Sequence, residues 1–276
     1  MAGTTSATLD DLFVNIVAQA RFTAEEQSLM AGLVRQYNIA GQAGKSVQIP
    51  KYPSITAADL TEGTATTDTD VETSSVSVDC SEVGASVLLT DLAAMGAGNP
   101  AEELGTVLGN AIATKLDSDI IALFDSFTES VGGATTEFTA GHIFEAVAKI
   151  RNNGVTSQLS CVVNPLAAYY LKEGLTNTFA GLDSDLANEA MRTGYLGTVA
   201  GVNVYESKNV AISGDASKGA VFAPEAIALA MKRDFNLETQ RNAGKRGTEM
   251  VATAIYGAAV LDQDYGVELH LDSAIA

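Results

Sequence analysis

The most informative stretch of this chain is residues 45–92, KSVQIPKYPSITAADLTEGTATTDTDVETSSVSVDCSEVGASVLLTDL. Two segments of strand-like composition, residues 46–50 and 74–89, flank a polar middle rich in Thr, Ser, Asp and Glu. The stretch has too few large apolar side chains to build a core of its own, and a long two-stranded arm is marginally stable alone in water. The arm therefore requires another surface to lie against, and a second copy of the same chain is the simplest one.

The hairpin character of this stretch rests on its periodicity and its turn residues. Val76, Val78 and Cys80 alternate with polar residues, the period of two that a strand requires. Pro50 restricts the backbone to extended conformations, and Gly63 with its Thr and Asp neighbours suits a turn. Lys and Arg are absent from residues 52–114, so the tip is acidic. Its acidic residues are Asp59, Glu62, Asp68, Asp70 and Glu72.

A strong helix start follows the arm. Asn99 can cap the helix, Pro100 fits its first turn, and two glutamates face its positive end. Apolar residues then recur every three or four positions through Phe127, which predicts a helix of about 28 residues and about 42 Å. We interpret it as a structural spine. Its apolar residues are Leu104, Leu108, Ile112, Leu116, Ile120, Leu123 and Phe127.

The rest of the chain mixes helices and strands without a regular βαβ repeat, which favours an α+β fold over a doubly wound sheet. Two amphipathic helices are expected in the first 44 residues, with apolar stripes at residues 9–17 and 29–37. Further helices are predicted at residues 140–152, 165–172, 182–192 and 224–231, and strands at 159–163, 202–205, 220–222, 235–240, 250–260 and 267–271.

Charge and composition exclude some classes of function. The chain of 276 residues carries a net charge of −18, which argues against nucleic-acid binding as its main role. The basic residues cluster late, at Lys232, Arg233, Arg241, Lys245 and Arg246. Arg241, Lys245 and Arg246 are interpreted either as a solvated hairpin turn or as the receiving site for the acidic tip of a neighbouring copy. No apolar run reaches the roughly 20 residues of a membrane helix, and the N-terminus does not resemble a signal peptide, so a cytoplasmic product is expected.

The catalytic motifs are weak. Gly96-Ala-Gly98-Asn-Pro-Ala101 fits a dinucleotide-binding pattern, but five residues separate it from the nearest strand, and the glutamates that follow would repel a pyrophosphate. A helix-start turn is the better interpretation, and a nucleotide-dependent oxidoreductase remains a remote alternative. His142 and His270 are the only histidines and no nucleophile elbow is present, so no catalytic, cofactor or metal site is expected. Cys80 and Cys161 are expected to be buried.

The order of these parts resembles the major capsid proteins of tailed bacteriophages, which share the Hong Kong 97-type shell fold. The segments that carry the resemblance are Val47-Gln-Ile-Pro50, Leu60-Thr-Glu-Gly63, Val87-Leu-Leu-Thr90, Cys161-Val-Val-Asn-Pro165, Gly197-Thr-Val-Ala-Gly-Val-Asn-Val204, Ala220-Val-Phe-Ala-Pro-Glu-Ala226 and Thr253-Ala-Ile-Tyr-Gly257. The resemblance implies an N-terminal arm (1–44), an extended loop (45–92), a peripheral domain with the spine helix (93–155), an axial domain (156–230), a return of the peripheral domain (231–262) and a C-terminal strand (263–276) in the axial domain.

The resemblance also implies a function. Copies would form hexamers and pentamers that tile an icosahedral shell around a DNA genome, without catalysis, after synthesis in the cytoplasm of a bacterial host. Portal, scaffolding and decoration proteins would be partners, with the scaffold expected as a separate protein, and the acidic wall would hold the DNA loosely. Some relatives join Lys and Asn side chains between subunits, but Lys45 and Lys51 lie on the near leg of the loop and that activity is not carried over. An encapsulin-like nanocompartment, which uses the same fold, is the close alternative.

Overall fold

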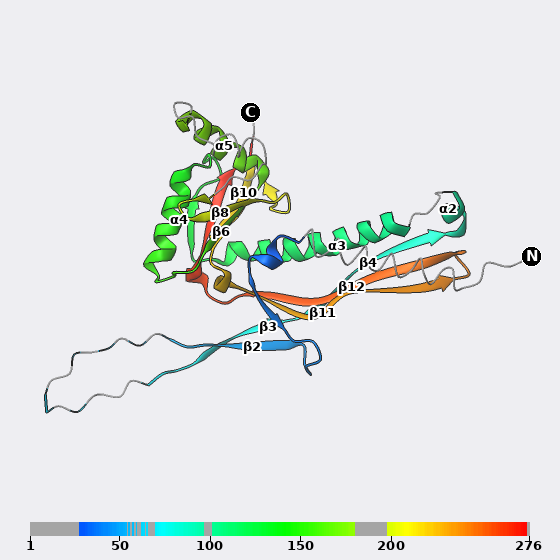
Figure 1. The fold of residues 1–276 in the computed structure, drawn as a ribbon, viewed down its shortest axis with the longest axis horizontal. Helices are drawn as coiled ribbons and strands as arrows, with labels where there is room; N and C mark the ends of the chain where they lie inside the picture. The colour runs from blue at the N-terminus through cyan, green and yellow to red at the C-terminus, as the bar shows by residue number, and fades with distance from the viewer. Residues whose placement is uncertain are drawn as a thin grey trace, which may run out of the picture.

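The computed structural model describes residues 28–53, 55, 57, 59, 62–63, 65, 70–96, 101–179 and 198–274. The helices expected at residues 9–17 and 182–192, and Asp68 of the acidic tip, lie outside these residues. The described chain is elongated and contains three sheets, with a long helix beside the first of them (Figure 1).

The first sheet has the strand order β1-β11-β12-β4. Strands β11 (Ile227–Asn242) and β12 (Gly247–Val260) form a long antiparallel hairpin. Strand β4 (Ser81–Thr90) pairs antiparallel with β12, and the short β1 (Arg35–Asn38) pairs parallel with the start of β11. Helix α3 (Ala101–Ile121) runs along this sheet and continues as the 3₁₀ turn η2 (Ala122–Ser126), which confirms the predicted spine (Figure 1).

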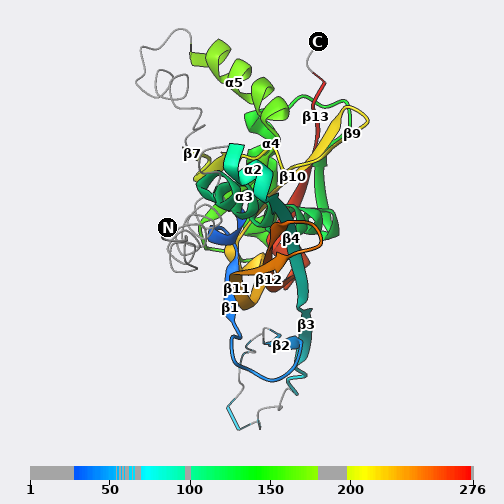
Figure 2. The same cartoon turned by 90° about the vertical axis from the view of Figure 1, so that its right-hand side faces the viewer.

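The second sheet has the order β5-β13-β10-β6-β8-β7. Its strand β6 (Leu159–Val163) is buried along its whole length, as its apolar run predicts. The helices α4 (Ala140–Asn152) and α5 (Pro165–Phe179) accompany this sheet. In the side view α5 projects to one side of α3 and the third sheet projects to the opposite side (Figure 2). The other strands are β5 (Glu129–Gly132), β7 (Thr198–Val199), β8 (Val202–Glu206), β9 (Ile212–Ser213, paired with β10), β10 (Ala216–Phe222) and β13 (Gly266–Asp272).

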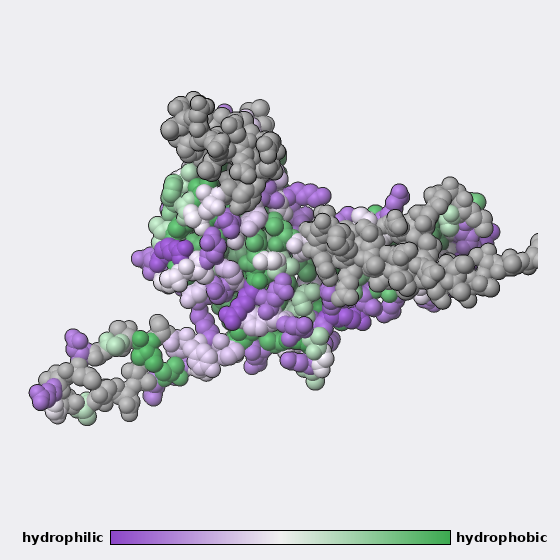
Figure 3. All heavy atoms as spheres, in the orientation of Figure 1, coloured by the Kyte–Doolittle hydropathy of each residue, from purple (hydrophilic) through white to green (hydrophobic). Residues whose placement is uncertain are grey.

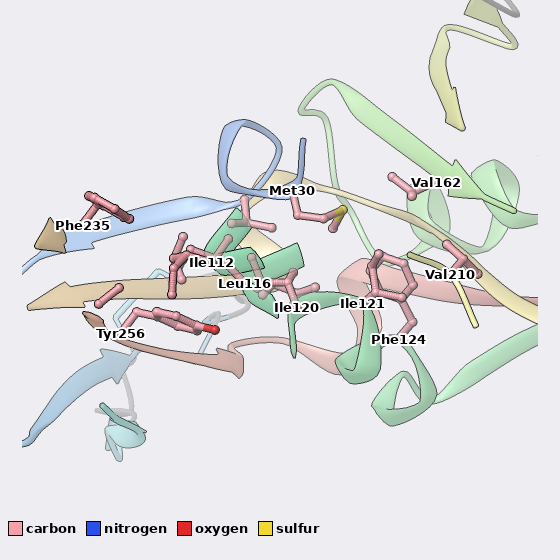
Figure 4. Packing of buried hydrophobic residues seen from close by; sticks show 14 of the residues in the cluster. Met30, Ile112, Leu116, Ile120, Ile121, Phe124, Val162, Val210, Phe235 and Tyr256 are labelled. Atoms are coloured by element: carbon pink, nitrogen blue, oxygen red, sulfur yellow. The ribbon is translucent and has the colours of Figure 1, made fainter. Parts of the chain in front are cut away.

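Two large apolar cores hold these layers together. The first core packs α3 against the first sheet, and the second packs α4 and α5 against the second sheet. Phe124 lies buried at the end of the spine (Figure 4). Its ring contacts those of Phe127 and Phe222, with ring centroids 6.2 Å and 5.4 Å away. Since Phe222 belongs to β10 of the second sheet, this aromatic cluster joins the spine to that sheet.

The arm is the third sheet, formed by β2 (Ser46–Lys51) and β3 (Ser74–Asp79). The single strand expected at residues 74–89 is two strands, β3 and β4, which separate at Cys80 and pair with different partners. In β3 the less exposed side chains have even numbers, at Val76 and Val78, whereas in β4 they have odd numbers, from Val83 to Leu89. The alternation therefore shifts by one residue between the two strands, where the pairing partner changes.

Two predicted helices are wrong. Residues 29–37 form a 3₁₀ turn, η1 (Met30–Gly32), followed by β1, because pairing with β11 overrides the helical spacing. Residues 224–231 form the short turn η3 (Pro224–Ala226) and then the start of β11. That start lies between β1 and β12 and is buried, so its apolar run has no alternation that would distinguish a strand from a helix.

Helix α5 extends to Phe179, beyond the predicted end at residue 172. Two short elements complete the described chain, α2 (Asp91–Gly96) after β4 and the turn η4 (Gln263–Tyr265) before β13. Among the described residues, no helix is both long enough and apolar enough to cross a membrane.

Candidate assembly surface

The arm leaves the first sheet at a tight backbone crossing. The ladder between β12 and β4 ends at Tyr256 and Ser81, and Gly257 follows on β12. A Cβ atom on Gly257 would lie 2.2 Å from the carbonyl oxygen of Asp79, so only glycine allows the two strands to approach this closely. The amide of Cys80 donates to the carbonyl of Lys45 at 2.8 Å, which ties the two legs of the arm together at the same place.

Two cations fix the base of the arm to its own chain, because Lys51 pairs with Asp262 at 2.6 Å and Lys232 donates to the carbonyl of Gly44. Beside them Arg233 pairs with Glu82 at 3.0 Å, which joins β11 to β4 within the first sheet. Beneath them, Ile39, Val78, Cys80, Ala228 and Ala230 form a small apolar cluster. Burial raises the pKa of the Cys80 thiol, which keeps it neutral. The direction of the arm is therefore set within the subunit.

Beyond its base, the arm exposes both apolar and acidic side chains. Tyr52 is 69% exposed and Ile55 is 58% exposed, and Val71 on the other leg is also exposed. Hydrophobic atoms are visible on the projecting loop, with hydrophilic ones beyond them (Figure 3). These apolar groups make no large contact within the described part of the subunit. The predicted acidic residues Asp59, Glu62, Asp70 and Glu72 are all exposed.

The basic turn lies at the opposite end of the molecule, between β11 and β12 (Figure 1). Arg241 binds the carboxylate of Asp91 through both guanidinium nitrogens, at 2.6 and 2.7 Å, and this contact holds the pKa of Asp91 below its usual range. The amide of Asp91 donates to the carbonyl of Arg246 at 2.9 Å. The sequence indicated Arg241 as a contact residue but not Asp91, the carboxylate that Arg241 binds within the same chain.

Lys245 and Arg246 remain exposed at the tip of this turn. Within the described part of the chain, neither side chain forms an ion pair. An exposed apolar side chain follows the contact of Asp91 with Arg246: Leu92, next to Asp91 on α2, is 84% exposed. Because the acidic arm and the basic turn lie at opposite ends, one subunit does not bring the predicted contact residues together (Figure 1).

A buried carboxylate on the spine escaped the sequence analysis. Asp117 is 1% exposed and accepts hydrogen bonds from the Ser28 hydroxyl at 2.9 Å and from the Leu29 and Met30 amides at 3.1 Å. Burial raises its pKa, and these hydrogen bonds partly oppose that rise. Its position was readable from the helical period, because Ala113 and Ile120 lie on the same buried face.

The motifs for enzyme chemistry find little structural support. Helix α2 lies between β4 and the glycine-rich segment, so the strand that a dinucleotide loop requires does not precede it. The Nδ1 atom of His142 accepts from the Thr139 amide at 3.2 Å, which is a helix-capping contact. No group of three or more potential metal ligands occurs among the described residues.

A hairpin sheet along a spine helix, a second sheet flanked by two helices, and a projecting arm define the Hong Kong 97-type shell fold. The class that this fold defines is that of shell-forming subunits. The sequence profile of the phage capsid protein family matches residues 81–269, more than half of the chain, and the chain belongs to this family. The predicted resemblance to major capsid proteins of tailed phages is confirmed.

Solved structures support the same fold. The chain is similar to a structure of Mycobacterium phage Che8, with a TM-score of 0.73 and 22% identity over 88% of this chain and 90% of that one. The chain is also similar to the acid-stable capsid structure of Helicobacter pylori bacteriophage KHP30, with a TM-score of 0.71 and 14% identity over 89% of this chain and 91% of that one. A virus-like particle from Pyrococcus furiosus is similar with a TM-score of 0.64 and 12% identity over 93% of this chain and 98% of that one. No curated protein sequence matches significantly.

Proposed function

We propose that this major capsid protein assembles as hexamers and pentamers into an icosahedral shell that encloses a DNA genome. The observation that carries the proposal is the part of the arm beyond its base, which projects from one end of an elongated subunit and exposes Tyr52 and Ile55. The family assignment supports a structural protein, and we propose that it has no catalytic activity.

The contact that we propose joins the two ends of neighbouring copies. The arm contributes the exposed Tyr52, Ile55 and the four described acidic residues, and the far end contributes Leu92, Lys245 and Arg246. Because the two patches differ, the contact is heterologous, and repeated heterologous contacts close into rings when the rotation allows it. Opposite charge at the rim favours the correct partner and speeds association.

The domain organisation follows the described sheets. In this proposal the first sheet and α3 form the peripheral domain, and the second sheet with α5 forms the axial domain, joined at Phe124. Pairing of β4 with β12 supports a loop that ends before residue 81, with residues 81–90 in the peripheral domain. Pairing of β5 with β13 and the packing of α4 in the second core support placing residues 129–152 in the axial domain.

Further partners follow from the same proposal. With a net charge of −18, the shell wall would contact packaged DNA loosely and without sequence preference. Portal, scaffolding and decoration proteins would complete the particle, and synthesis would occur in the cytoplasm of the bacterial host.

Electron microscopy of the purified full chain tests this function. Closed polyhedral shells or ring-shaped capsomers are expected, and shells recovered from infected cells should contain DNA. Shells filled with a protein cargo would favour an encapsulin-like compartment instead. A dispersed monomer at high concentration would contradict both.

Charge reversal at the basic turn tests the proposed contact itself. Lys245→Glu and Arg246→Glu together should slow assembly and invert the effect of salt on it, because salt would then screen a repulsion at this contact instead of an attraction. Replacing Asp59 and Glu62 by Lys should restore assembly in that background. Lys208→Glu is the control, since Lys208 is also exposed but lies away from the turn. Unchanged assembly and salt dependence in the reversed variant would rule out this contact.

A further inference from the structure

A groove of about 710 Å³ opens beside the first sheet, between α3, the segment from Ser28 to Ala40, and β11. It exists because β1 pairs with β11 only as far as Asn38 and Met231. Beyond that point the register of β11 is irregular up to Asn236. The groove has a floor of buried apolar residues, and polar residues line the rest of it. The floor residues are Ile112, Ala113, Leu116, Phe235 and Ala254, and the polar ones are Ser28, Gln36, Asn38, Lys232 and Asp234.

The chain approaches this groove in a fixed direction. Ser28 lines the groove, and its hydroxyl and the next two amides are held by the buried Asp117 of the spine. The side chain of Met30 is fully buried in the first core immediately afterwards (Figure 4). Residues 1–27 therefore join the described chain at the rim of an apolar surface.

We propose that the amphipathic stripe of residues 9–17 of the same chain seats in this groove. The stripe presents Leu9, Leu12, Phe13, Ile16 and Val17 at helical spacing, which matches an apolar floor. The eleven residues from Val17 to Ser28 span at most about 40 Å when extended, whereas α3 is about 31 Å long. The chain between Val17 and Ser28 is therefore long enough for the stripe to reach every part of the groove. The contact does not depend on shell assembly.

Fluorescence tests the proposal, because the chain contains no tryptophan. Phe13→Trp in the full chain should give blue-shifted emission and several-fold weaker quenching by acrylamide than an exposed control. Phe144→Trp is that control, since Phe144 is 57% exposed on α4. Emission and quenching equal to those of the control would overturn the proposal.

Cross-linking identifies which copy provides the stripe. Phe13→Cys and Ala40→Cys, joined by a short bismaleimide, should give a product within one chain, because Ala40 is exposed and lines the groove. The native cysteines should not react because both are buried. Either single variant should give no such product. A product between two chains would show that a neighbouring copy fills the groove and would overturn the same-chain assignment.

Discussion

The crossing at Gly257 offers the sharpest test of how the arm is held. Gly257→Ala would place a methyl group 2.2 Å from the carbonyl oxygen and 2.7 Å from the carbonyl carbon of Asp79. Ordinary contact begins near 3.4 Å, so the two strands must separate by about 1.2 Å. Overpacking of this kind costs about 1–3 kcal/mol. The separation also disturbs the amide of Cys80, which binds Lys45 at the base of the arm.

Urea unfolding and the yield of assembled particles measure this effect. We expect Gly257→Ala to lower the free energy of unfolding by about 1–3 kcal/mol. We also expect it to reduce assembly and to speed amide exchange in β2 and β3. Gly174→Ala on α5 is the matched control, because its added Cβ would meet nothing within 4 Å. The control should be neutral or stabilised by about 0.5–1 kcal/mol. If Gly257→Ala unfolds and assembles as the wild type does, the crossing does not position the arm.

Three further predictions concern the spine and the basic turn. Phe124→Ala should lower the free energy of unfolding by about 3–5 kcal/mol, whereas Phe124→Leu should lose less than about 1.5 kcal/mol; equal losses in urea denaturation would contradict the ring packing. Since burial raises the pKa of Asp117, the native state binds its proton more tightly than the unfolded state, so stability should fall as pH rises from about 4 through that raised pKa. Asp117→Asn should remove this part of the pH dependence in thermal melts. If the variant shows the same pH dependence as the wild type, Asp117 is not its cause. Arg241→Gln should speed amide exchange in residues 242–247 without changing global unfolding, because its pair with Asp91 is half exposed; unchanged exchange would show that the pair does not hold the turn.

The elements that the sequence predicted well are those with strong local signals. The helix at residues 140–152 and the strand at residues 159–163 match the structure at both ends, because a capping threonine and a bounded apolar run mark them. Residues 29–37 and 224–231 failed for the opposite reason. Their conformation is decided by pairing between β1 and β11, whose partners are almost 200 residues apart in the chain.

The candidate site was predictable only in part. The exposed acidic arm and the basic turn were visible as a charge asymmetry. The pairing of Arg241 with Asp91 and the anchoring of Ser28 by Asp117 were not, because each joins segments at least 89 residues apart. Distant pairs of this kind leave no periodic trace in a single sequence.

The division of one extended segment into β3 and β4 has a mechanical consequence. A pull on the arm is transmitted through Cys80 directly into the hydrogen-bond ladder of β12, without an intervening flexible loop. Strand β12 has 14 residues, about 46 Å, and its far end carries the basic turn. Tension at one end of the subunit is therefore transmitted to the other end along the continuous strand β12. Neighbouring copies that bind opposite ends are mechanically coupled through this strand.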